Sequence, residues 1–427
     1  MDSSTERTAP LPPVVERFLR YVQIDTEADR DAHSTPSSEK QKDLSRLLAE
    51  ELQGLGLDDA AMDDFGYVYA SLPAAPAAAA AAPNLALVAH VDTSPDAPGG
   101  PVKPLIHQDY DGSVIELPGD PSIKLDPAQS PELLSHLGHD LISSDGTTLL
   151  GSDDKAGVAI IMQTVEDLLA DPELPRPALK ICFTVDEEVG RGVDELDLAR
   201  LDAQVAYTID GGGVGTFSFE TFNAAAAVIK VRGVGVHPGY AKDVMANATT
   251  IAGEIIAALP SHEAPETTSD REGYFCPYQV HADITAAEIH FLLRDFTGDG
   301  LDRRKRLLQQ VVDAAGTRHP RAEITLEITD NYRNMREYIE QTDPRAISFA
   351  FAAAEAMGVE LVEELVRGGT DGSRLSEMGL PTPNVFTGGH DFHSRFEWNT
   401  VQNLVAALSY VKGLVAYWAE HGGEAGK

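Results

Sequence analysis

The chain contains very little cysteine. It has two such residues, Cys182 and Cys276, in a total of 427. So few thiols cannot build a disulfide framework, which favours a reducing compartment such as the cytoplasm. Cys182 lies inside an apolar run and is most simply explained as a small buried residue.

Long apolar runs are also missing. No stretch approaches the roughly 20 apolar residues that span a bilayer. The N-terminal segment "MDSSTERTAPLPP" has neither the basic region nor the apolar core of a secretory signal. We therefore expect a cytoplasmic protein that does not engage a membrane.

Basic residues are heavily outnumbered. The 33 lysines and arginines face 68 acidic residues, which gives a formal net charge of -35. A nucleic-acid-binding protein needs a basic face, so we predict no nucleic-acid partner. Most of the acidic excess must lie on a solvated surface, although a few acids are enough for a metal site.

What the chain does have is a regular alternation of strand and helix patterns. Its 427 residues are too many for one ordinary core and suggest two domains. Apolar runs at 84–91, 178–190 and 203–215 alternate with helical spacing at 38–57 and 154–170. This alternation predicts an α/β domain with a mostly parallel sheet covered on both faces.

The order of predicted strands and helices changes in the middle of the chain. Between residues 223 and 333 the pattern becomes β-α-β-β-α-β, the order of a ferredoxin-like unit. The α/β pattern then resumes. We therefore predict a discontinuous α/β domain at 1–222 and 334–427, interrupted by an inserted domain at 223–333.

Acidic residues and histidines follow the predicted strands at the points where they end. In an α/β sheet these ends face a common crevice. Each residue alone has a simpler interpretation, such as a helix cap or a turn. Adjacent carboxylates after one strand repel each other unless a cation is near. The candidates are His90, Asp92, Asp153, Asp154, Glu187, Glu188, Asp210 and His393.

Taken together, these residues indicate metal chemistry. Two histidines and three carboxylates suffice for two zinc ions that share one carboxylate. Such a pair lowers the pKa of a shared water, and a further carboxylate then takes up the proton. The sequence contains no H-E-x-x-H, no G-x-S-x-G and no phosphate-binding loop motif, so other hydrolase or nucleotide chemistry is not indicated.

Several segments occur in an order that is specific in combination. They are "HVDTSPD", "TTLLGSDDKAG", "FTVDEEVGRG", "AYTIDGGGVG" and "RGGTDGSRLSEMGLPTPNVFTGG", followed by His393. They resemble those of the co-catalytic zinc exopeptidases, aminoacylases and related amidohydrolases, and most of all the tripeptide aminopeptidases. The resemblance implies a doubly wound mixed-sheet catalytic domain of the zinc-exopeptidase type with an inserted ferredoxin-like α+β lid domain.

The resemblance also implies a ligand set for two Zn²⁺ ions per chain, for which Co²⁺ or Mn²⁺ can substitute. His90 and Asp210 would hold the first ion. Glu188 and His393 would hold the second, and Asp153 would bridge both.

The implied activity is release of the N-terminal residue from small peptides, specifically tripeptides. Glu187 would be the general base that activates the bridging water. Asp92 would orient His90 by accepting its other N–H, as metal-bound histidines usually require. A dipeptidase or an N-acyl amino acid amidohydrolase of the same fold remains an alternative, because fold and metals do not separate them.

Substrate binding would fall to the inserted domain. His237 would stabilise the oxyanion, and Arg294 would grip a carboxylate, for which a planar guanidinium is suited. The alternative for Arg294 is an ion pair with its neighbour Asp295. Asn247 and Arg367 are weaker candidates. The resemblance also allows a homodimer through the lid domain.

Four positions depart from the family pattern. Glu377 stands where a large apolar residue is usual. Ser152 stands where alanine is usual, and His390 and Asp391 stand where tyrosine and asparagine are usual. His390 is a competing candidate for a metal ligand, and Asp391 is a candidate for contact with the substrate amine.

Overall fold

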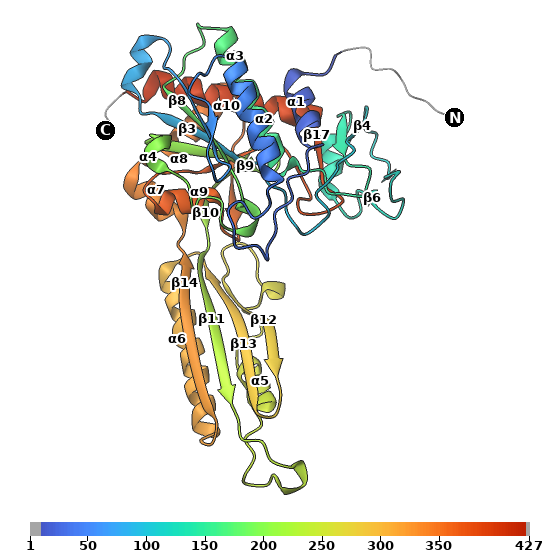
Figure 1. Cartoon of the computed structure of the whole chain (residues 1–427), viewed down its shortest axis with the longest axis vertical. Helices are drawn as coiled ribbons and strands as arrows, with labels where there is room; N and C mark the ends of the chain where they lie inside the picture. The colour runs from blue at the N-terminus through green and yellow to red at the C-terminus, as the bar shows by residue number, and fades with distance from the viewer. Residues whose placement is uncertain (1–9, 424–427) are drawn as a thin grey trace. The chain divides into compact units, whose positions relative to one another are not determined.

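The computed structural model describes residues 10–423, which form two compact units (Figure 1). The first unit comprises the described part of Met1–Phe219 with Tyr338–Glu364 and Thr370–Lys427. The second comprises Glu220–Glu337 and Leu365–Gly369. The expected boundaries lie a few residues inside those of the second unit, and the short return at 365–369 was not anticipated.

An eight-stranded sheet forms the centre of the first unit. Its order is β1-β2-β8-β3-β9-β16-β10-β15. The strands β8, β3, β9 and β16 are parallel to one another, whereas β2 and β10 pair antiparallel at either side. The bounds are β1 Ala61–Met62, β2 Val68–Leu72, β3 Leu85–His90, β8 Leu179–Thr184, β9 Val205–Gly211, β10 Thr216–Thr221, β15 Val362–Val366 and β16 Asn384–Phe386. The predicted mixed sheet is confirmed.

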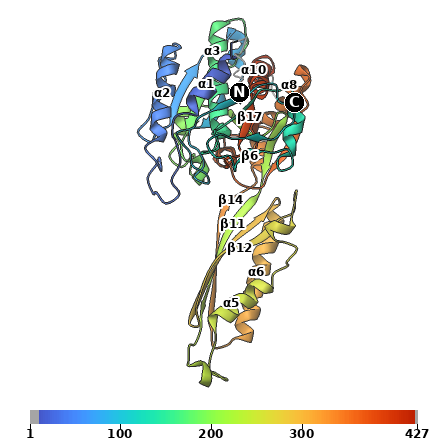
Figure 2. The same ribbon diagram turned by 90° about the vertical axis from the view of Figure 1, so that its right-hand side faces the viewer.

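Helices bury the central strands. All six residues of β3 are buried, as expected of a parallel strand covered on both faces. Helix α3 packs on β3 and β9 and contacts α1 and α10, while α2 packs on β1 and β2 (Figures 1 and 2). The helix bounds are α1 Pro13–Tyr21, α2 Gln41–Gly54, α3 Ser152–Ala170, α4 Leu198–Leu201, α7 Met335–Thr342, α8 Arg345–Met357, α9 Asp371–Glu377 and α10 Val401–His421.

Short strands order the stretch from 94 to 146. β4 Leu105–His107 and β17 Trp398–Thr400 flank β7 Leu141–Ser143 in a three-stranded sheet. β5 Ile115–Glu116 pairs with β6 Lys124–Leu125. A separate apolar cluster that includes Leu133 and Trp398 lies beneath them. Strands of two or three residues are too short to show a period in the sequence.

The second unit has the element order β-α-β-β-α-β. Its antiparallel sheet runs β12-β13-β11-β14, and α5 and α6 cover one face of it (Figure 2). Ile229, Ile289 and Phe291 belong to the core cluster of this unit. The bounds are β11 Asn223–Arg232, α5 Ala248–Ala257, β12 Tyr274–Ala282, β13 Ala286–Asp295, α6 Gly298–Arg318 and β14 Glu323–Tyr332. No helix within residues 10–423 is long and apolar enough to cross a membrane.

Candidate active site

His90 is the last residue of β3, at the carboxyl end of the parallel strands. Its side chain is 2% exposed. The Nδ1 atom lies 3.1 Å from the main-chain oxygen of Asp92 and 3.4 Å from the Asp92 carboxylate. With Nδ1 facing these oxygens, Nε2 is left to face the acids of neighbouring loops.

The five predicted metal ligands lie in one cluster. His90 Nε2 lies 3.0 Å from Oδ1 of Asp153 and 3.5 Å from Oδ1 of Asp210. His393 Nε2 lies 3.3 Å from Oδ2 of Asp153 and 3.0 Å from Oε2 of Glu188. Asp153 therefore presents one carboxylate oxygen to each histidine, which is the arrangement expected of a ligand shared by two ions.

The ligands come from the ends of strands, the start of a helix and the turns that follow the strands at one edge of the sheet. Asp153 lies in the first turn of α3 with non-helical dihedral angles, φ -85° and ψ 106°. Glu188 lies in the short 3-10 turn Glu187–Val189 after β8. Asp210 lies in β9, where Asn384 accepts from its N–H and donates to its carbonyl, both at 3.1 Å. His393 has a positive φ of 59°, which is uncommon for a residue with a side chain.

Asp92 contacts the turn after β8 as well as His90. Its two carboxylate oxygens accept the main-chain N–H groups of Glu187 at 3.1 Å and of Glu188 at 3.2 Å. The side chain is fully buried. Asp92 therefore links the loop that carries His90 to the turn that carries Glu187 and Glu188, a connection that the H-x-D spacing alone did not predict.

The cluster is strongly charged. Burial, followed by the negative charge of Asp153, raises the pKa of Glu188 to about 8. Burial also raises the pKa of Asp210 to about 6. Hydrogen bonds to Asp153 and Glu188 raise the pKa of His393 to about 11. These pKa shifts indicate that the cluster holds more negative charge than two histidines can neutralise. Divalent cations would neutralise the excess.

The residues fit a pair of divalent cations. Oε1 of Glu188 is buried and has no hydrogen-bond partner within residues 10–423. Nitrogen and carboxylate oxygen atoms are the donors that zinc takes. Ligand atoms of His90, Asp153 and Glu188 lie within 4.8 Å of one another, as do those of His90, Asp154 and Asp210.

Asp154 has its own partners. Its carboxylate accepts the N–H of His90 at 3.3 Å and that of Gly157 at 3.2 Å. Burial, with the charge of Asp210 adding to it, raises the pKa of Asp154 well above its usual range. Asp154 thus ties the start of α3 to the end of β3.

The sequence did not single out three further acids around the cluster. Asp96 Oδ2 lies 3.3 Å from Nδ1 of His393, and its Oδ1 lies 2.6 Å from Arg30. Asp371 accepts the Thr184 hydroxyl at 2.7 Å, and burial raises its pKa to about 7. The third acid is Glu397. Asp96 and Asp371 carried a signal, because they lie in the "HVDTSPD" and "RGGTDGSRLSEMGLPTPNVFTGG" segments, whereas Glu397 carried none.

His390 and Asp391 lie outside the ligand cluster. The His390 ring stacks on Trp398 at 4.2 Å, and burial lowers its pKa to about 4. Asp391 accepts the Ser130 hydroxyl at 2.6 Å and the Trp398 indole N–H at 2.9 Å. Neither contact involves a predicted metal ligand, so these contacts do not place His390 among the ligands.

The arginines proposed for substrate lie in the second unit. Arg294 donates to the carbonyls of Ala225 at 3.3 Å and Leu293 at 3.0 Å, and it has no carboxylate partner within residues 10–423. The alternative ion pair with Asp295 is wrong, because Asp295 pairs with Arg304 instead.

Arg367 is more fully engaged than Arg294. Its guanidinium donates to the carbonyls of Asp270 at 2.7 Å and Glu272 at 3.1 Å, and it lies 5.0 Å from the centre of the Phe222 ring. It therefore stabilises the loop before β12.

The other two candidates of the second unit have local partners. Asn247 caps α5 by accepting the N–H groups of Thr249 and Thr250 at 3.0 and 3.4 Å. His237 accepts the N–H of Gly239 at 3.1 Å in an exposed loop. Asn247 therefore has a structural role that explains its presence without substrate.

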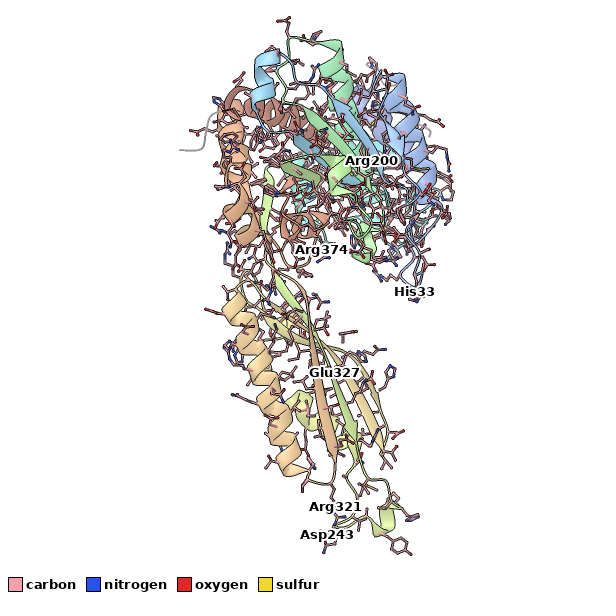
Figure 3. All side chains as sticks on the ribbon, turned by 60° about the vertical axis from the view of Figure 1, so that its left-hand side comes forward. His33, Arg200, Asp243, Arg321, Glu327 and Arg374 are labelled. Carbon is pink, nitrogen blue, oxygen red and sulfur yellow. The ribbon has the colours of Figure 1, made fainter. Side chains whose placement is uncertain are left out.

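His237 and Arg294 belong to opposite ends of the same sheet. Ala224 pairs with Arg294, and Arg232, five residues before His237, pairs with Ala286. The strand between these pairs spans about 26 Å at about 3.3 Å per residue. Figure 3 shows Asp243, on the loop of His237, beside Arg321 at one end of this unit, where Arg321 donates to Val244 at 3.2 Å.

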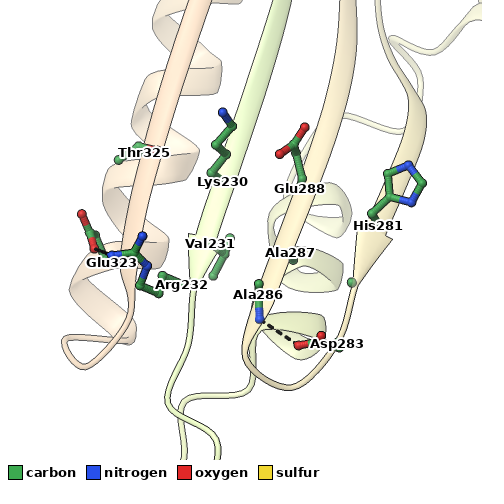
Figure 4. Close-up of a pocket in the computed structure, with 11 residues that line it drawn as sticks. Lys230, Val231, Arg232, His281, Asp283, Ala286, Ala287, Glu288, Glu323 and Thr325 are labelled. Carbon is green, nitrogen blue, oxygen red and sulfur yellow. Dashed lines mark hydrogen bonds and ion pairs between the residues drawn. The ribbon is translucent and has the colours of Figure 1, made fainter.

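A hollow of about 510 Å³ opens on the sheet of the second unit (Figure 4). Its side chains mix both signs of charge, and Arg232 pairs with Glu323 at 3.3 Å. The charged and polar lining residues are Lys230, Arg232, His281, Asp283, Glu288, Glu323 and Thr325. The hollow includes none of the predicted ligands, so it is separate from the metal cluster.

Known proteins are similar to this chain in sequence and fold. The family model described as peptidase family M20/M25/M40 matches residues 148–417. Peptidase T of Desulfitobacterium hafniense is 43% identical over 407 residues, covering 95% of this chain and 98% of the relative. Peptidase T of Bacillus subtilis is 42% identical over 398 residues, covering 93% and 96%.

Solved structures have a similar fold. Aminopeptidase PepT from Bacillus cereus has a TM-score of 0.74 at 22% identity, with 95% of this chain and 98% of that chain covered. A tripeptidase from Staphylococcus aureus has a TM-score of 0.75 at 20% identity, with 97% and 100% covered. The sequence match over nearly the whole chain confirms the predicted resemblance, and the protein belongs to the M20/M25/M40 peptidase family.

Proposed function

We propose that this protein is a tripeptide aminopeptidase that works with two divalent cations, zinc in the first instance. The observation that carries the proposal is the position of Asp153, whose two oxygens face His90 and His393. The 43% identity to a peptidase T over 407 residues supports the choice of tripeptides. We further propose that Co²⁺ or Mn²⁺ can substitute and that the enzyme acts in the cytoplasm.

The proposed ligands divide between the two ions. His90 and Asp210 would hold the first, Glu188 and His393 would hold the second, and Asp153 would serve both. When bound, the ions supply an activated water and polarise the carbonyl that it attacks. Proton transfer and substrate binding are then carried out by side chains of this protein.

Glu187 is the proposed general base. It accepts a proton from the attacking water and returns it to the nitrogen of the leaving amine. Burial raises the pKa of Glu187 well above its usual range, which suits a carboxylate that holds a proton between these two events. Asp92 fixes the main chain of Glu187 and so sets where this carboxylate lies.

Arg294 is the proposed anchor for the C-terminal carboxylate of the substrate. It carries a charge with no carboxylate partner among the described residues. An anchor for the C-terminal carboxylate would select for peptide length, because an extended tripeptide spans only about 10 Å. Arg367 supports this anchor by ordering the loop before β12.

His237 cannot serve the same substrate as Arg294 of the same chain. The roughly 26 Å of strand between their ends of the sheet exceeds the length of a tripeptide. We therefore propose that His237 reaches substrate only in a homodimer formed through the second unit, where it serves the partner's site. Sedimentation of the protein, with His237→Ala activity measured alongside, tests this arrangement.

The decisive experiment combines metal counting with a substrate comparison. The purified protein should bind two ions per chain and cleave a tripeptide faster than a dipeptide or an N-acetyl amino acid. Chelation should abolish the activity. Glu187→Gln should lower kcat by about 10²- to 10⁴-fold and keep both ions. Activity that survives metal removal would exclude the mechanism, and preference for the dipeptide or the acetylated substrate would favour the alternative activity.

Arg294→Ala separates the proposed substrate anchor from the chemistry. We expect a large rise in KM for tripeptides with little change in the number of bound ions. Lys230→Ala is a matched control, since Lys230 is another cation of the second unit that lines the separate hollow. Unchanged tripeptide turnover in Arg294→Ala would remove Arg294 from the substrate site.

A further inference from the structure

Glu397 is a buried acid to which the proposed reaction assigns no step. It is 1% exposed and lies four residues after His393, directly before β17. All three hydrogen bonds that it accepts within residues 10–423 come from main-chain N–H groups. A carboxylate buried without a cation is costly, so its position calls for a structural or functional reason.

The three bonds converge on one short segment. Oε2 of Glu397 accepts the N–H groups of Leu150 and Gly151, both at 2.8 Å. Oε1 accepts the N–H of Asp153 at 3.0 Å. Two residues further along the chain, Asn399 donates to the Ser152 hydroxyl at 2.9 Å. Alternate residues of one extended stretch thus hold the whole of 150–153.

This segment has little to fix it internally. Gly151 has a φ of +77°, and Asp153 has non-helical dihedral angles at the start of α3. Yet the Asp153 carboxylate must meet two histidines at once, at 3.0 and 3.3 Å. A small rotation of the segment would lose one of the two contacts.

We infer that Glu397 is the positioning residue that aims the Asp153 carboxylate at both His90 and His393, an inference that rests on the proposed two-ion function. Only a carboxylate fits this task. Its two oxygens serve three N–H donors, whereas an amide has one accepting oxygen and would turn its own N–H₂ toward a donor. Supporting residues of this kind usually change metal affinity or activity by 10- to 100-fold when replaced.

The test compares Glu397→Gln with Asp145→Asn in the full-length protein. Asp145 is a matched control because it is also buried, at 6% exposed, and accepts the N–H of Thr147 at 3.0 Å without contacting a ligand. Metal-free samples are titrated with Mn²⁺ by equilibrium dialysis, and magnetic coupling between the ions is followed by electron paramagnetic resonance.

We expect wild type and Asp145→Asn to bind two coupled ions. Glu397→Gln should bind the first ion within threefold of wild type, bind the second 10- to 100-fold more weakly and lose the coupling. Two ions bound with wild-type affinity and coupling in Glu397→Gln would overturn the inference and leave the proposed function intact. A wild-type protein that binds fewer than two ions would instead overturn the proposed function.

Amide hydrogen exchange on the metal-free proteins supplies a readout that needs no ion. The N–H groups of Leu150, Gly151 and Asp153 should exchange at least tenfold faster in Glu397→Gln and at the wild-type rate in Asp145→Asn. Unchanged exchange would show that Glu397 does not hold the segment. If Glu397→Gln fails to fold, Glu397→Asp, one methylene shorter, takes its place with the same expected losses.

Discussion

At the scale of single residues, the active site is organised by side chains that bind the main chain of neighbouring loops. Asp92 accepts the N–H groups of Glu187 and Glu188, and Asn384 holds both polar groups of Asp210. These bonds are partly buried, and a hydrogen bond left unmade away from water is expensive. The ligands are therefore held by residues that contact no substrate.

Asp92→Ala should separate catalysis from metal binding. The substitution removes the acceptor for the N–H groups of Glu187 and Glu188, so the proposed base is displaced. We expect kcat to fall by about 10- to 100-fold while most of the metal is retained. His90→Ala should instead lose the first ion. Kinetics together with metal analysis distinguish the two, and equal loss of metal in both variants would contradict the prediction.

Asp96→Asn should weaken the second ion selectively. Asp96 faces Nδ1 of His393 and is the only described carboxylate that does so. We expect the affinity for the second ion to fall by about tenfold, because the ring loses the negative charge of the partner that orients it. Glu39→Gln is the control, since Glu39 is an exposed acid that pairs with Lys42 and with no other cation among residues 10–423. Calorimetric titration that finds the first ion weakened instead would refute this role.

At the scale of elements, the site depends on close contact between α3 and β9. A Cβ at Gly157 would lie 1.8 Å from the carbonyl oxygen of Ile209 and 2.5 Å from Asp154. Only glycine lets the helix approach the strand this closely. The "DDKAG" segment therefore combines a ligand, Asp153, with the residue that seats its helix beside Asp210.

Gly157→Ala should destabilise the first unit by about 1–3 kcal/mol, because the new methyl group overlaps the β9 backbone. Gly316→Ala in α6 is the matched control. It meets nothing within 4 Å, so the better helix propensity of alanine should stabilise the protein by about 0.4–1 kcal/mol. Urea denaturation measures both. Equal stability of the two variants would contradict the close approach.

At the scale of the whole molecule, the excess of acidic groups determines how stability depends on pH and metal. The formal net charge of -35 is spread over many exposed acids, but the buried carboxylates around the ligands are the ones that couple folding to metal. Carboxylates must be deprotonated to hold an ion, so metal and protons compete for the same oxygens.

The metal-free protein should lose stability as pH rises from 6.5 to 8. Folding raises the pKa of Glu188 from 4.5 to about 8 and that of His393 from 6.5 to about 11. In this interval the folded chain binds more protons than the unfolded chain, so stability falls with increasing pH. Thermal unfolding of chelated protein measures this. The ion-loaded protein should show no such loss, and a chelated protein that is more stable at pH 8 than at 6.5 would contradict the prediction.

Much of the site was predictable because parallel strands deliver their carboxyl ends to one edge. His90, Asp153, Glu188, Asp210 and His393 follow strands or open a helix, and the structure brings all five together. Asn247, a weaker substrate-binding candidate, caps a helix, and its contact with substrate stays a prediction. Glu397 was missed, since a side chain that binds main-chain N–H groups leaves no spacing in the sequence.

The sequence by itself determined the mixed α/β sheet, the family and the chemical types of the ligands, because strand periodicity and motif order are local properties. Only the tertiary structure decided which oxygen of Asp153 faces which histidine, that Asp92 binds the turn of Glu187, and that Glu397 holds the segment before Asp153. These contacts join residues far apart in the chain. Their geometry is set by how loops from different strands pack, and no single stretch of sequence encodes it.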